Sequence, residues 1–132
     1  MKKDGLLHAE LSRLVAALGH HDLLVIGDAG LPVPDGVPVV DLALCPGVPG
    51  FLQTLETVLG ELVVQEGVID VEMASVSPAM RAAFDAVWPA GLPLREVPHL
   101  ELLEITAGAA AIVRTGEFTP YANVVLVAGV PF

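Results

Sequence analysis

The chain has 132 residues, of which 54% are hydrophobic, and a formal net charge of −10 at pH 7. Its sixteen acidic against six basic residues argue against nucleic acid and polyphosphate partners, which need positive surface, and favour a neutral small molecule. No uninterrupted apolar run reaches the roughly 18 residues of a membrane span, so we expect no membrane insertion.

The length fits one domain over residues 1–132 with a proper core. A monomer with a mean hydropathy of +0.70 would expose large apolar patches, so we expect a homo-oligomer. The single cysteine, Cys45, cannot form an internal disulfide, and polar residues interrupt any apolar signal segment near Lys2 and Lys3. These features predict a cytoplasmic location.

Helical and strand patterns alternate through the first half of the chain. The first helix is predicted over about residues 6–18 from apolar residues at helical spacing: Leu7, Leu11, Leu14, Val15 and Leu18. A short strand over Asp22–Ile26 follows, then a loop rich in Gly and Pro, and a strand over Val39–Leu44. Another helix begins after Pro49 and leads to a strand over Leu62–Val71.

The second half continues the alternation. Ser77 and Pro78 form a helix start, followed by a short strand over Leu94–Val97 and a short helix after His99. The last two strands are expected over Ala109–Arg114 and Asn123–Ala128. Their connection is too short for a crossover helix, which favours an antiparallel pair. The sequence therefore predicts an α/β fold: three α/β/α layers, a mostly parallel sheet and an antiparallel C-terminal strand pair.

Several common motifs are absent. No GxGxxG, Walker A or GxSxG pattern occurs, so we expect no nucleotide cofactor and no serine-hydrolase chemistry. His20 and His21 are adjacent, and in extended backbone their side chains would point to opposite faces. That placement disfavours a shared metal ion, and we expect no metal site.

Two dissociable side chains flank the first strand. His20 has an ordinary pKa near working pH and is a candidate general acid or base, although it could simply close a helix–strand junction. Asp28 could bind a ligand hydroxyl, although Asp at the start of a Gly/Pro loop commonly forms an Asx turn.

Further polar candidates lie toward the C-terminus. His99 could be a second ligand-binding imidazole or an exposed loop residue. Tyr121 and Asn123 alternate around one residue, so a phenol and an amide could face one cavity, although Tyr121 could also pack on the sheet edge. Arg114 and Glu117 are expected to be structural and to pair with each other.

These residues stand in blocks that resemble the D-ribose pyranase family. The blocks are the opening MKK, LGHHDLLVIGDAGLPVP (residues 18–34), DLALCPGVPGFLQTL (residues 41–55) and IVRTGEFTPYANVVLVAGVPF (residues 112–132). The chain is also similar to the related fucose mutarotases, but its DAGLP and YAN elements favour the pyranases. Between about residues 75 and 98 the chain is shortened and proline-rich beside the family.

The resemblance implies a cofactor-independent sugar isomerase that interconverts the pyranose and furanose forms of D-ribose. His20 matches the proton-donating histidine, and the substrate-binding residues match Asp28, His99, Tyr121, Ala122 and Asn123. It further implies a ring-shaped homo-oligomer, an octamer or a decamer, with sites near subunit boundaries. Two alternatives remain: a mutarotase that interconverts pyranose anomers, and a non-catalytic sugar-binding module of a ribose transport system.

Overall fold

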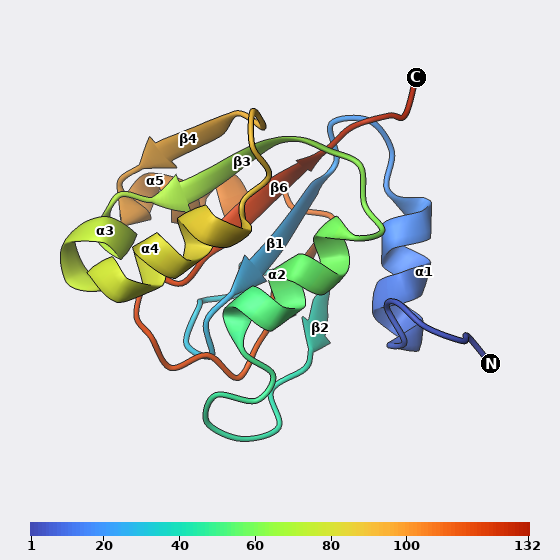
Figure 1. Ribbon diagram of the computed structural model, residues 1–132, viewed down its shortest axis with the longest axis horizontal. Coiled ribbons are helices and arrows are strands. Elements are labelled where there is room, and N and C mark those ends of the chain that lie inside the picture. The colour runs from blue at the N-terminus through green and yellow to red at the C-terminus, as the bar shows by residue number, and fades with distance from the viewer.

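The apolar segments of the chain pair into one six-stranded sheet with helices on both faces (Figure 1). The computed structural model describes residues 1–132. The strands are β1 (Leu23–Gly27), β2 (Val39–Asp41), β3 (Val64–Asp70), β4 (Leu94–Val97), β5 (Ala111–Arg114) and β6 (Val124–Ala128). The helices are α1 (Ala9–Ala17), α2 (Phe51–Leu59), α3 (Glu72–Val76), α4 (Pro78–Val87) and α5 (His99–Thr106).

Strand directions confirm the predicted α/β fold with a mostly parallel sheet. The order across the sheet is β2-β5-β1-β6-β3-β4, and β6 runs antiparallel to both of its neighbours, β1 and β3. The other neighbouring strands pair in parallel. One detail of the prediction is corrected: β6 does not pair with β5, because β1 lies between them and the short connection passes over its end.

Both faces of the sheet are covered, as the predicted three layers require. Leu24 and Ile26 of β1 belong to a core cluster of 19 buried residues, which includes Phe51 of α2 and Phe84 of α4. Val25 points the other way, into a cluster of 7 buried residues that includes Leu102 of α5. This double burial explains why the central strands are apolar runs rather than alternating patterns.

The ends of several elements differ from the sequence prediction. Helix α1 begins at Ala9 rather than near residue 6, because Nδ1 of His8 accepts a hydrogen bond from Leu11 N at 3.2 Å and caps the helix. Strand β2 ends at Asp41, whose Oδ1 accepts from Ala43 N at 3.0 Å and turns the chain. The short helix α3 was not predicted. No helix combines the length and the apolar character that crossing a membrane requires.

Candidate active site

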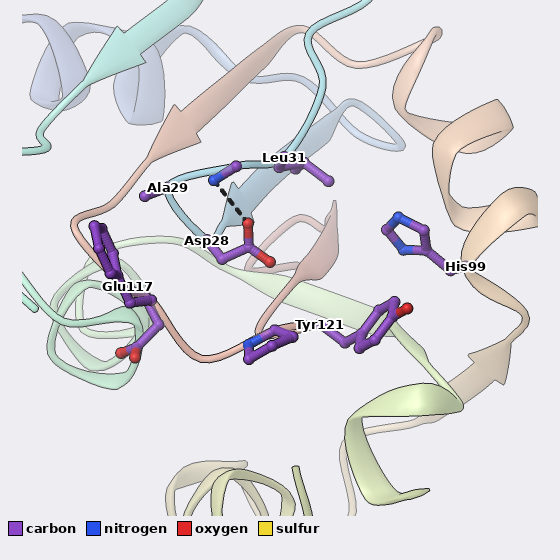
Figure 2. Close-up of a pocket in the computed structure, with 9 residues that line it drawn as sticks. Asp28, Ala29, Leu31, His99, Glu117 and Tyr121 are labelled. Carbon is purple, nitrogen blue, oxygen red and sulfur yellow. Dashed lines mark hydrogen bonds between the residues drawn. The ribbon is translucent and has the colours of Figure 1, made fainter. Parts of the chain in front are cut away.

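A cavity of about 460 Å³ lies where two loops and the start of a helix meet at one edge of the sheet (Figure 2). The parallel strands β1 and β4 end at this edge, and the antiparallel strand β6 begins there. Loops after parallel strands commonly form such sites. The lining residues come from the loop after β1, the start of α5 and the loop before β6: Asp28, Ala29, Gly30, Leu31, His99, Glu117, Phe118, Pro120 and Tyr121.

Asp28 is fixed at both its backbone and its side chain. Its Oδ1 accepts from Gly30 N at 2.9 Å in an Asx turn, and its backbone N–H donates to Asn123 Oδ1 at 3.0 Å. The other carboxyl oxygen points into the cavity (Figure 2). Burial raises the pKa of Asp28 above its ordinary value, and hydrogen bonds from Gly30 and Asn123 oppose that rise. One side chain therefore both forms the turn and offers an oxygen to the cavity.

His99 is the first residue of α5 and is held by two carboxylates. Its ring Nδ1 lies 2.8 Å from Oδ1 of Asp70, and its backbone N–H donates to the Glu72 carboxylate, at 3.0 Å for Oε2. Its ring packs edge-on against Tyr121, with centroids 5.1 Å apart and planes at 83°. The ring thus faces the cavity in a defined orientation.

Tyr121, Ala122 and Asn123 take three different positions. Tyr121 lines the cavity with a φ of 62°, in the left-handed region, so the alternation expected with Asn123 does not occur. Ala122 is fully buried in the larger core cluster. Asn123 is fully buried behind the cavity, where its Nδ2 donates to Asp70 Oδ2 at 2.9 Å. The predicted common cavity for the phenol and the amide is therefore wrong.

The sequence did not single out Asp70, although it lies at the centre of the hydrogen bonds behind the cavity. It ends β3, is fully buried, accepts a hydrogen bond from Asn123 and is hydrogen-bonded to His99. Burial raises the pKa of Asp70, and the hydrogen bonds from Asn123 and His99 act in the opposite direction. A charged residue at the end of an apolar strand was the one signal available.

Glu117 lines the cavity, but its carboxylate points away from it (Figure 2). Its Oε2 accepts from Phe51 N at 3.2 Å at the start of α2, and its Oε1 accepts from the Thr119 hydroxyl at 2.8 Å. Burial raises its pKa, but these hydrogen bonds outweigh burial and leave the pKa of Glu117 below its ordinary value. The expected pairing with Arg114 is wrong, because Arg114 pairs with Asp41 on β2.

His20 lies at the opposite edge of the sheet, before β1, and not in this cavity. Strand β1 has five residues, and a strand rises about 3.3 Å per residue, so its two ends lie roughly 15 Å apart. The ring of His20 stacks on that of His21 with centroids 3.7 Å apart. The prediction that these rings point to opposite faces is wrong, because His21 has a φ of 72° and is not extended.

Gln65 of β3 holds this histidine pair. Its Oε1 lies 2.8 Å from His20 Nε2, and its Nε2 lies 2.9 Å from His21 Nδ1. An amide oxygen accepts and an amide nitrogen donates, so His20 carries a proton on Nε2 and His21 has a bare Nδ1. Both rings are exposed in the single chain.

Comparisons with known proteins show to which family the chain belongs. The model of the RbsD / FucU transport protein family matches residues 1–131. The chain belongs to this family. It is 54% identical to the D-ribose pyranase of Symbiobacterium thermophilum and 48% identical to that of Laribacter hongkongensis, over the full length of all chains.

Solved structures agree with this membership. The structure of Bacillus subtilis RbsD complexed with D-ribose matches with a TM-score of 0.95 and 41% identity, covering both chains completely. A fucose mutarotase from Streptococcus pneumoniae, in complex with L-fucose, matches with a TM-score of 0.79 and 20% identity over the full length of both chains. The second likeness shows a shared fold.

Proposed function

We propose that this chain is a D-ribose pyranase, which interconverts the pyranose and furanose forms of D-ribose without a cofactor. The main support is the cavity of Asp28, His99 and Tyr121 in a chain about half identical to proteins of that name. The match to a ribose-bound relative over the whole chain adds to it. We also propose a cytoplasmic location, consistent with the free thiol of Cys45.

The reaction needs only proton transfers and positioning. The anomeric hydroxyl loses its proton as its oxygen becomes the carbonyl at C1, the bond from C1 to the ring oxygen breaks, and the ring oxygen takes up a proton. Attack of a different hydroxyl on the same carbonyl then closes the other ring. A positioned acid or base accelerates such a step by about 10²–10⁴-fold, and holding the open chain near one closure adds to this.

The cavity residues suit the role of binding sugar hydroxyls. Asp28 offers a carboxyl oxygen, His99 a ring nitrogen and Tyr121 a phenol to the same space. Asn123 holds the backbone of Asp28 from behind. Ala122 fixes the turn between Tyr121 and Asn123 through its place in the core. We therefore assign Asp28, His99 and Tyr121 to direct contact with the sugar. Ala122 and Asn123 support substrate binding from behind the cavity.

The proton donor, His20, reaches such a cavity only in a neighbouring copy of the chain. Within one chain the length of β1 separates it from Asp28. Apolar side chains beside the cavity are exposed, with Phe118 at 67% and Leu100 at 76% exposure, as a surface covered by a second copy would be. We therefore propose a homo-oligomer, a ring of eight or ten copies, whose sites combine two chains.

Saturation-transfer NMR on D-ribose with catalytic amounts of protein tests the activity. We expect new transfer between pyranose and furanose anomeric signals. Transfer confined to the α and β pyranose signals would instead identify a mutarotase. Changes in the ribose chemical shifts on binding, without saturation transfer between signals, would identify a sugar-binding module.

Mixing two inactive variants tests the shared site. His20→Ala and Asp28→Asn each damage one half of the proposed site, so each oligomer alone should exchange ribose slowly. After the two are unfolded and refolded together, some sites combine an intact His20 with an intact Asp28, and activity should return in part. No recovery in oligomers that contain both chains would contradict a site built from two copies.

A further inference from the structure

The hydrogen bonds behind the cavity assign a role to a residue outside the proposed binding set. We propose that Asp70 is a positioning residue that holds His99 with its proton on Nδ1, so that Nε2 can accept a proton from a sugar hydroxyl. His99 would then be the base that complements His20. This inference rests on the proposed pyranase activity and names the part of the site that removes the proton.

With Asp70 ionised, the geometry leaves one consistent arrangement of protons. Asp70 is fully buried, and its two oxygens each face a side-chain nitrogen: His99 Nδ1 at 2.8 Å and Asn123 Nδ2 at 2.9 Å. Asn123 cannot reverse its amide, because its Oδ1 accepts from Asp28 N at 3.0 Å. An ionised carboxylate accepts both hydrogen bonds, so the His99 proton sits on Nδ1.

That arrangement determines what the cavity side of the ring can do. A neutral imidazole with its proton on Nδ1 has a bare Nε2, which is an acceptor. The chain offers Nε2 no hydrogen-bond partner, and His99 lines the cavity. When Nε2 takes a proton, the positive ring lies directly against the Asp70 carboxylate. Fixing a histidine through the hydrogen bond of its other nitrogen is how the aspartate of serine-protease triads acts.

The same bonds connect His99 to the rest of the site. Asp70 and Glu72 lie two positions apart and hold the ring and the backbone of His99, respectively. From Asp70 the bonds continue through Asn123 to the backbone of Asp28 on the far side of the cavity. The buried side chains of Asp70 and Asn123 thus fix the position of His99 relative to Asp28.

Nitrogen-15 NMR of the imidazole ring tests the assignment in the wild-type protein without sugar. We expect the neutral His99 ring to show a protonated Nδ1 and a bare Nε2. A neutral ring with its proton on Nε2 would overturn the assignment. This measurement needs no variant, so it decides the point even if a substitution at residue 70 prevents folding.

Asp70→Asn tests the consequence for activity. The introduced amide has one acceptor for two donors, so its oxygen can keep Asn123 while its nitrogen donates to His99 Nδ1. The His99 proton then moves to Nε2, and ribose exchange should fall by about 10²-fold, at the lower end of what a positioned base contributes. The variant should show this tautomer change together with the loss of rate.

Glu104→Gln is the matched control, since it makes the same chemical change at an exposed position of α5. It should keep both the wild-type tautomer and an exchange rate within about twofold of wild type. If Asp70→Asn keeps the wild-type rate, the role of Asp70 is only structural. A wild-type protein that does not exchange ribose would contradict the proposed function instead, and the ring tautomer would still report on the contact with Asp70.

Discussion

The two ends of strand β1 lie at opposite edges of the sheet, and the side chains at these edges differ in how firmly the single chain holds them. At the edge where β1 ends, buried groups hold Asp28, His99 and Tyr121 around a cavity. At the edge where β1 begins, His20 stacks on His21 in the open and contacts one amide, that of Gln65. The first edge is organised within the single chain, and the second presents an imidazole pair to solvent.

Under the proposed mechanism, this difference separates sugar binding from proton delivery. At the edge that holds the cavity, burial raises the pKa values of two carboxyl groups, Asp28 and Asp70, which lowers the free energy of unfolding when these groups are ionised. At the other edge His20 is exposed in the single chain, so no such cost arises there. In the proposed oligomer it acts only against another copy. A substitution of His20 should therefore affect activity and leave stability nearly unchanged, whereas a substitution of Asp28 should affect activity and also the pH dependence of stability.

The largest effect on activity is expected at the exposed edge. His20→Ala removes the proposed proton donor and should slow ribose exchange by about 10²–10⁴-fold. Because His20 is exposed and lies outside both core clusters, the free energy of unfolding should change by less than about 0.5 kcal/mol. Saturation transfer and urea denaturation measure the two quantities. Wild-type exchange in this variant would remove His20 from the mechanism.

At the buried edge, Asp28→Asn should reduce exchange by about 10- to 100-fold, as expected for a lost hydrogen bond to a charged group. Its stability at neutral pH should not fall. The folded chain binds the Asp28 proton more tightly than the unfolded chain, so this group's contribution to the unfolding free energy falls as pH rises from 3.8 through the raised pKa.

The amide of this variant does not titrate, so its stability should depend less steeply on pH across that acidic range. Asp70 is shifted in the same direction and remains, so a slope should persist. Urea denaturation at a series of pH values gives both curves. A variant less stable than wild type at neutral pH, or one with an unchanged slope, would contradict the assignment of a raised pKa to Asp28.

Gln65→Leu should have the smallest effect, because it leaves His20 in place and removes only the amide that orients it. Loss of one or two such hydrogen bonds corresponds to about a 3- to 10-fold slower exchange. Gln65→Glu is the informative comparison: its carboxylate can accept from His20 but cannot donate to His21. If both variants exchange ribose as wild type does, the orientation of the histidine pair is unimportant.

Local patterns predicted most of the fold. Apolar spacing and start signals located the main helices, because one face of each packs on the sheet. The short connection before β6 correctly predicted its direction. It did not predict the neighbours of β6, because β1 and β3 are distant from it in the sequence. Helix α3 was missed, because five residues give too little periodicity.

The site was harder to predict, because backbone geometry and burial decide it. Asp28 and His99 were found as polar residues beside apolar strands, and both line the cavity. Tyr121 and Asn123 were expected to point the same way, but Tyr121 has a left-handed backbone conformation. The rings of His20 and His21 were expected to point to opposite faces, but His21 is also left-handed. Asp70 could not be singled out, since its partners His99 and Asn123 lie 29 and 53 positions away.

The central place of β6 has a consequence for how the protein is made. β6 spans residues 124–128 and lies between β1 and β3, two strands synthesised much earlier. Until β6 leaves the ribosome, the inner edges of β1 and β3 have no neighbour in the middle of the sheet. Pairing of such distant segments is slow and leaves apolar strands exposed in the meantime. The sheet therefore closes only after residue 128 has been synthesised, and the facing edges of β1 and β3 stay unpaired until then.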